Sequence, residues 1–211
     1  MRLRLALAAT LLAGSAAAAA DSGPMPADQP VDGRSQAQWT RAWWQWASSF
    51  DQAASPVADT TGERCRAGQA GPVFFLAGTY GTHRTIRTCT MPAGKFVFFP
   101  LLNYLVMRPQ ERQVGCAAVT AYAHDSMEGA THLVLRIDGV EQGGLEKHRL
   151  DSDGCFDVGV RRTPPASIWP SAADGYYVML RPLAPGRHTL DFGGVLPGDM
   201  IQAVSYVLDV R

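Results

Sequence analysis

Four of the five tryptophans in this 211-residue chain fall within eight positions, in the stretch WTRAWWQW at 39–46. Exposed indole rings can stack on a sugar ring, whereas buried ones fill a core. Trp39, Trp43 and Trp46 recur at steps of four and three residues, which predicts the buried face of an amphipathic helix. Trp44 lies about 100° from Trp43 around such a helix. Trp44 is therefore the tryptophan of this cluster best suited to meet a ligand.

Three more residues, with Arg84, are candidates for a separate pocket. Tyr80 and His83 flank a turn that contains glycine, and Trp169 lies in the irregular stretch 162–175. Long irregular loops in compact domains are frequently functional. Only the fold can bring these side chains together, and the predicted ligand-binding residues are Trp44, Tyr80, His83 and Trp169.

Carboxylates cluster in two short stretches, DTTGERC at 59–65 and DSDGCFD at 151–157. Calcium is bound by loops that supply six to eight oxygen ligands, and neither stretch has that number in the required spacing. Hydrogen-bonded turns are the favoured interpretation. The five histidines are scattered without metal-ligand spacing, so no metal and no other cofactor is expected.

Motifs of nucleophilic catalysis are absent from the sequence. There is no G-x-S-x-G elbow and no H-E-x-x-H, and the Gly-Lys pair at 94–95 lacks the other residues of a phosphate-binding loop. A hydrolase that uses paired carboxylates or a histidine stays open as an alternative, because a sequence does not show which acids face each other.

The first 20 residues have the organisation of a secretory signal peptide. Two arginines precede an apolar run, and small residues end at Ala20. No later segment has the ~20 apolar residues of a membrane span. The 19 basic and 19 acidic residues balance, so the chain has no net positive charge that would attract nucleic acid. An exported protein is therefore expected, in the periplasm or outside the cell, without a nucleic-acid partner or a membrane span.

The four cysteines allow three disulfide pairings. Export into an oxidising compartment favours two disulfides over a metal site, and no C-x-x-C pair occurs. Loops of moderate length close most easily, so we favour pairing Cys65 with Cys89 and Cys116 with Cys155.

Patterning along the chain predicts the elements. Residues 21–33 are rich in proline and aspartate and are expected to form a flexible leader. The Trp-rich helix follows, and a second helix is expected near 117–128. Apolar runs at 72–78 and 95–102, with a strand-like run at 85–90 between them, are interpreted as a meander.

Further strands follow the second helix. Asp138-Gly139 predicts a hairpin, another is expected around the turn at 184–186, and alternating apolar residues at 204–210 predict a half-buried strand. These short strands predict a mainly β protein: an antiparallel β-sandwich-like domain with one or two packed α-helices, formed by residues 34–211.

The chain resembles a group of uncharacterised exported bacterial proteins. The shared blocks are WWQW, D-x-T-G-x-x-C (59–65), Q-x-GPVFFLAG (69–78), R-x-C-x-x-PAGK-x-x-FFP (87–100) and PLAPG-x-HTL (182–190). The resemblance implies a common fold, and no activity comes with it.

Three functional hypotheses follow. The first is a non-catalytic binding or envelope-associated module whose partner is a polysaccharide or another envelope component, and it requires exposed aromatic rings. The second is a secreted hydrolase, which requires converging acidic or histidine side chains in a cleft. The third is a structural or assembly protein, which requires an apolar patch or an open sheet edge.

Overall fold

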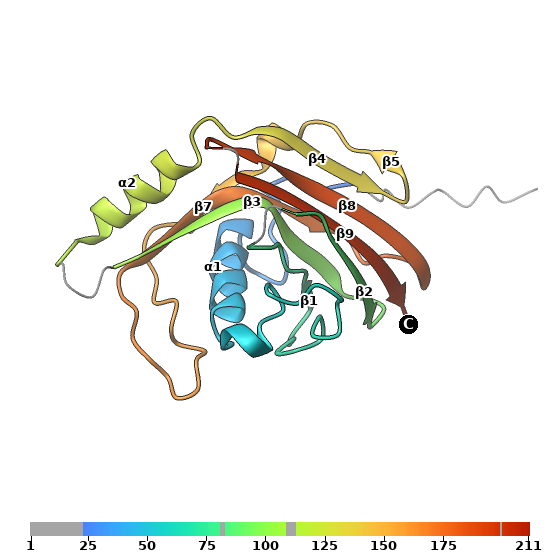
Figure 1. The fold of residues 1–211 in the computed structure, drawn as a ribbon, viewed down its shortest axis with the longest axis horizontal. Helices are drawn as coiled ribbons and strands as arrows, with labels where there is room; N and C mark the ends of the chain where they lie inside the picture. The colour runs from blue at the N-terminus through green and yellow to red at the C-terminus, as the bar shows by residue number, and fades with distance from the viewer. Residues whose placement is uncertain (1–22, 81–82, 109–112, 199) are drawn as a thin grey trace, which may run out of the picture.

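The computed structural model describes residues 23–80, 83–108, 113–198 and 200–211. The predicted signal peptide, residues 1–20, lies outside these residues. Two packed β-sheets and two α-helices form the fold (Figure 1), as the sequence predicts. In the described part of the chain, no helix has the length and apolar character needed to cross a membrane.

One sheet has four strands and the other has five. Strand pairs are antiparallel except for two parallel pairs, β1 with β3 and β2 with β9. The four-stranded sheet has the order β1 (Val73–Phe75), β3 (Phe96–Met107), β7 (Ser171–Leu180), β6 (Arg149–Asp151), and the five-stranded sheet has the order β2 (Thr85–Met91), β9 (Met200–Val210), β8 (Gly186–Leu196), β4 (Thr131–Ile137), β5 (Val140–Glu141).

The main core lies between the two sheets. Strand β9 shows how alternation builds it, because Val204, Tyr206, Leu208 and Val210 are all buried. Side chains of β3 and β7 meet them from the facing sheet, and side chains of the neighbouring strand β8 pack beside them. The alternation predicted for 204–210 is confirmed.

Helix α1 (Gln36–Ala47) covers the outer face of the four-stranded sheet and forms a second core there (Figure 1). Its start has a capping box of Ser35 and Gln38. Trp39, Trp43 and Trp46 are each at most 4% exposed, which confirms the predicted buried face. The cluster is therefore mostly packing.

The indole N–H groups of α1 also connect the helix to separate parts of the chain. Trp39 donates to the backbone oxygen of residue 31, Trp43 to that of residue 76 and Trp46 to that of residue 67. Trp44 donates instead to the hydroxyl of Tyr177 on β7. Buried indoles need such acceptors, so the helix is fixed in one orientation.

The expectation that residues 21–33 form a flexible leader is wrong for the part that the structure describes. From residue 23 onward it packs on the domain: Met25 and Val31 are 2% exposed, and the Met25 N–H donates to Met179 O at 2.8 Å. The Gln36 side chain donates to the carbonyl of Pro26 at 2.6 Å. Two buried apolar side chains and these hydrogen bonds offset the disorder that the composition alone predicts.

Both favoured disulfides are present. Cys65 bonds to Cys89 and Cys116 to Cys155, across 24 and 39 residues of sequence. Closed loops of this length each stabilise a fold by about 3 to 4 kcal/mol. The second disulfide ties the first residue of α2 to the loop before β7.

Helix α2 (Cys116–Ser126) lies at one end of the sheets and packs on β3 and β7 through Val119 and Ala123 (Figure 1). The predicted second helix near 117–128 is thus confirmed. Two short 3₁₀ turns complete the helical elements, η1 (Gln52–Ala54) and η2 (Leu145–His148).

Two local interpretations of the strands are wrong. The runs predicted as a meander are divided between the sheets, because β1 and β3 pair in parallel while β2 joins β9 in the other sheet. The expected hairpin around 184–186 is a crossing between sheets, since β7 and β8 belong to different ones. The Asp138-Gly139 hairpin of β4 and β5 is confirmed.

Candidate ligand-binding site

A cavity of about 210 Å³ opens where α1, β3, the loop at 79–80 and the start of β9 meet. We call it the Trp44 pocket. It is lined by Trp43, Trp44, Val57, Thr79, Tyr80, Leu102, Asn103, Leu196, Met200, Ile201 and Gln202.

Two predicted ligand-binding residues meet at this pocket, although 36 positions separate them in sequence. Trp44 is half-buried and Tyr80 is 68% exposed, so aromatic surface faces the opening. No charged side chain is found among the described residues of the lining. A neutral ligand with an apolar face therefore suits this pocket.

The other two predicted residues do not join them. His83 is exposed on the segment before β2, and Trp169 is 50% exposed in the loop before β7. Neither is among the described residues that line the Trp44 pocket. The pocket predicted for Tyr80, His83, Arg84 and Trp169 is not this cavity, because Tyr80 alone of the four is among the described residues that line it.

A β-bulge in β3 puts Asn103 on the pocket side. Pro100 lies opposite Tyr177 while Leu102 lies opposite Tyr176, so β3 has one extra residue at this point. The extra residue shifts the alternation of the strand, and odd-numbered residues beyond it face α1. Leu105 is consistent with this shift, because Leu105 and Trp44 pack against the same buried cluster of Phe156, Val158 and Ala173.

Gly175 lies opposite Asn103 on β7 and leaves it room. A Cβ at Gly175 would lie 2.5 Å from the backbone oxygen of Leu102 and 2.8 Å from the Cβ of Asn103. The close approach of the two strands here is possible only without a side chain at 175.

Trp44, Tyr177 and Asn103 form a polar row behind the pocket. The Trp44 N–H donates to the Tyr177 hydroxyl at 2.8 Å. Burial raises the pKa of Tyr177, and the side chains of Asn103 and Trp44 beside the hydroxyl lower it in part. The Asn103 Nδ2 is buried and makes no hydrogen bond of regular geometry within the described structure. The Asn103 amide is thus the incompletely bonded polar group of the pocket wall.

Gln202 holds the bulge against the opposite wall. Its Nε2 donates to Pro100 O at 3.0 Å and to Leu101 O at 2.6 Å, and its Oε1 accepts from the Thr79 N–H at 3.2 Å. A Cβ at Gly78 would lie 2.3 Å from Oε1, so this approach requires glycine. Gln202 is therefore a structural clamp, whereas Asn103 has bonding capacity left.

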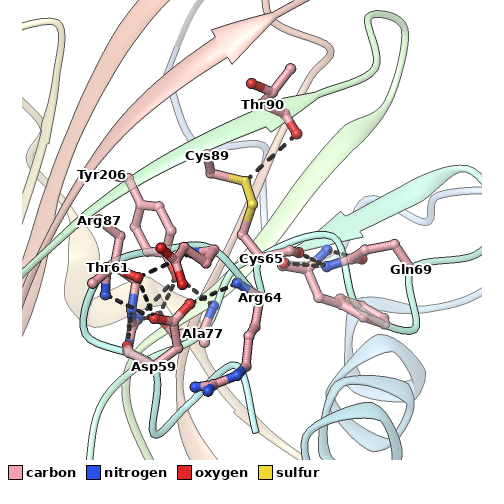
Figure 2. Close-up of a disulfide and its surroundings, with 12 residues drawn as sticks. Asp59, Thr61, Arg64, Cys65, Gln69, Ala77, Arg87, Cys89, Thr90 and Tyr206 are labelled. Carbon is pink, nitrogen blue, oxygen red and sulfur yellow. Dashed lines mark hydrogen bonds between the residues drawn. A yellow bond between two sulfur atoms is a disulfide. The ribbon is translucent and has the colours of Figure 1, made fainter. Parts of the chain in front are cut away.

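A buried arginine fixes the far wall of the pocket. Arg87 is 1% exposed and donates to the backbone oxygens of Val57, Asp59, Ala77 and Gly78 at 2.7–3.1 Å. Figure 2 shows Arg87 beside Asp59, Ala77 and Tyr206. Val57 lines the pocket directly, and residues 77–78 lead into its 79–80 segment. Arg87 is thus a positioning residue for this wall.

The turn at 59–65 supports Arg87 from the same side (Figure 2). The Asp59 carboxylate accepts from the Thr61 N–H and the Arg64 N–H, both at 2.8 Å. Burial by itself raises the pKa of Asp59, but these hydrogen bonds outweigh it and hold the pKa below its ordinary value. The stretch therefore forms the expected hydrogen-bonded turn, next to the disulfide at Cys65.

A second cavity, of about 450 Å³, lies between α2 and β7 and contains ionisable groups. Asp174 is buried and accepts from Arg149 Nε at 3.0 Å. His124 lies 3.3 Å from Asp174 and 3.3 Å from Glu128, and Arg149 also bonds Glu128 at 2.7 Å. Each of these groups has an opposite charge or a partner beside it, as in a structural ion-pair network.

The described residues contain no group of three or more His, Cys, Asp or Glu side chains arranged to hold a metal ion. In comparisons with known proteins, no family model, no curated protein and no solved structure matches the chain.

The sequence reasoning missed Asn103, Gln202 and Arg87. Asn103 carried a signal, because its amide is the one strongly polar side chain in the run FVFFPLLNYLVM. Arg87 carried another, since alternation in TIRTCTM puts it on the same face as Cys89. No sequence pattern indicated the role of Gln202, because that role depends on a bulge in a strand a hundred residues away.

Proposed function

We propose that the chain is an exported, non-catalytic binding module that takes a neutral sugar ring of a polysaccharide in the Trp44 pocket. The observation that carries this proposal is the pairing of Trp44 and Tyr80 at an uncharged cavity with amide groups in its wall. The apolar face of a sugar ring packs against aromatic rings, while its oxygens bond to amides.

The properties of the pocket favour this ligand class over others. A phosphate or carboxylate group is disfavoured because no cationic side chain lines the described wall. The two disulfides suit the oxidising compartments where cell-wall and extracellular polysaccharides are found. The volume of about 210 Å³ lies below the ~300 Å³ at which pockets for drug-sized ligands begin, so one ring rather than several is expected to enter.

The test is depletion of the mature protein from solution by insoluble polysaccharides: peptidoglycan, chitin, cellulose and xylan. We expect retention on at least one of them, and at least tenfold weaker retention of Tyr80→Ala. The Tyr80 side chain is largely exposed, so its removal leaves the fold intact, as circular dichroism will verify. Trp169→Ala is the matched control, because it removes an exposed aromatic ring outside the pocket and should be retained as wild type.

Retention of Tyr80→Ala at the wild-type level would contradict the pocket assignment. Absence of retention of folded wild type on all four materials would contradict the proposed function itself.

A hydrolase is the second candidate, and one observation favours it: His124, Asp125, Asp151 and Asp174 line one cavity. It predicts release of soluble sugars from one of the same polysaccharides, and loss of that release in Asp125→Asn. No release during prolonged incubation would remove this candidate.

A further inference from the structure

The wall of the Trp44 pocket is more apolar than a fully hydroxylated sugar requires. Val57, Leu102 and Leu196 are buried around it, and Met200 lies at its edge. Of its two side-chain amides, Gln202 already uses both ends for backbone groups. A sugar hydroxyl turned toward these aliphatic side chains would lose its water partners without replacement, which disfavours binding.

The Tyr177 hydroxyl decides how the remaining amide is oriented. Its oxygen accepts from Trp44 and still has one hydrogen to donate. Asn103 is the side chain beside it, and Nδ2 cannot accept that hydrogen. A half-turn of the amide would put Oδ1 next to the hydroxyl as the acceptor of that hydrogen, and would free the NH₂ group from Tyr177 for a ligand in the pocket that Asn103 lines.

A ligand group that matches this wall has one carbonyl acceptor and a small apolar end. The acetamido group has both: its oxygen would accept from the Asn103 NH₂, and its methyl would pack on the aliphatic side chains of the lining, Leu102, Leu196 and Val57. The sugar ring that bears it would then lie against Trp44 and Tyr80 at the opening.

We propose, on the basis of the proposed function, that the ligand is a 2-acetamido sugar and that Asn103 is the residue that selects it. Asn103 is the only asparagine in the chain, and the β3 bulge and Gly175 both serve to place it.

Chitin and cellulose provide a matched pair of probes, because they share a β-1,4-linked backbone and differ in an acetamido group against a hydroxyl group on each ring. Binding is measured by depletion on the two solids, and by tryptophan fluorescence with diacetylchitobiose and cellobiose. We expect at least tenfold tighter binding of chitin and diacetylchitobiose. Equal binding of the two members of each pair would overturn the acetamido inference and leave the sugar-binding function standing.

Two variants test Asn103 itself. Asn103→Asp keeps the shape and the acceptor for Tyr177 but has no NH₂ group, and Asn103→Leu removes both. We expect each variant to lose at least tenfold in affinity for diacetylchitobiose, with binding of cellobiose unchanged. Wild-type affinity in the folded Asn103→Asp protein would refute the role of Asn103. Folded wild type that binds neither chitin nor cellulose nor any other polysaccharide would refute the inference together with the proposed function.

Discussion

Replacing Arg87 by methionine tests whether the buried guanidinium organises the pocket wall. The side chain makes five hydrogen bonds, four to backbone oxygens and one to the Tyr206 hydroxyl at 3.0 Å. Its guanidinium also lies 5.4 Å from the centroid of the Tyr206 ring. Methionine fills much of the volume but donates nothing, so the carbonyls of Val57, Asp59 and Gly78 lose these donors.

The expected cost follows from those carbonyls. Each buried acceptor left without a donor costs about 1 to 3 kcal/mol, and relaxation of the loops recovers part of the sum. We expect the free energy of unfolding to fall by about 3 to 5 kcal/mol, in the range found when one partner of a buried charged network is removed. For a domain of this size, the melting temperature should fall by about 10 °C.

The assay is urea and thermal unfolding of the disulfide-bonded protein. Arg64→Met is the matched control, since Arg64 is an exposed arginine in the neighbouring turn (Figure 2) and should change the stability by less than about 0.5 kcal/mol. A loss below about 1 kcal/mol in Arg87→Met, close to that of the control, would refute the argument that this arginine holds the wall.

Three further predictions concern backbone contact and pH. Gly175→Ala should destabilise the protein strongly, because the new Cβ would meet backbone atoms of β3, whereas Gly143→Ala, which meets nothing within 4 Å, should not; urea midpoints compare them. Burial lowers the pKa of His148, so the folded state resists protonation and stability falls as the pH drops below about 6.5; His148→Gln should flatten this fall in urea midpoints from pH 7.5 to 5, and an unchanged slope would contradict it. For His188, burial opposes the charge, but hydrogen bonds to Asp138 and to a backbone carbonyl outweigh it and raise the pKa, so its contribution is full below about pH 6.5 and is lost as the pH rises through the raised value. His188→Gln should therefore cost more stability at pH 5.5 than at pH 8.5, and an equal cost at both would count against the shift.

The local sequence pattern was sufficient to predict helix α1, strand β9 and the face that each of them buries. The helical spacing of the tryptophans predicted both α1 and its buried side, and alternation at 204–210 predicted the inward face of β9. The favoured disulfide pairing was also correct. The helix and the strand face depend on residues that are close together in the sequence, and the disulfide pairing depends on the closure of loops of moderate length.

Strand partners were not predictable in the same way. A strand has two edges, and nothing in TIRTCTM states that β9 rather than a nearby strand will occupy one of them. The pocket was not predictable for the same reason. Trp44 and Tyr80 were each recognised as candidates, but the sheet order brings them together and the β3 bulge turns Asn103 toward them.

The pairing of β2 with β9 has a consequence for the order in which the molecule assembles. Residues 85–91 meet residues 204–210, so β2 has no sheet partner until the chain up to β9 is available. In the folded chain its other edge is partly covered, because the Thr88 N–H donates to Thr61 O at 2.9 Å. Met200, Ile201 and Gln202 arrive with β9 and close the Trp44 pocket. The proposed ligand binding should therefore recover only once β9 has joined the sheet, and its rate of recovery after dilution from urea would time that step.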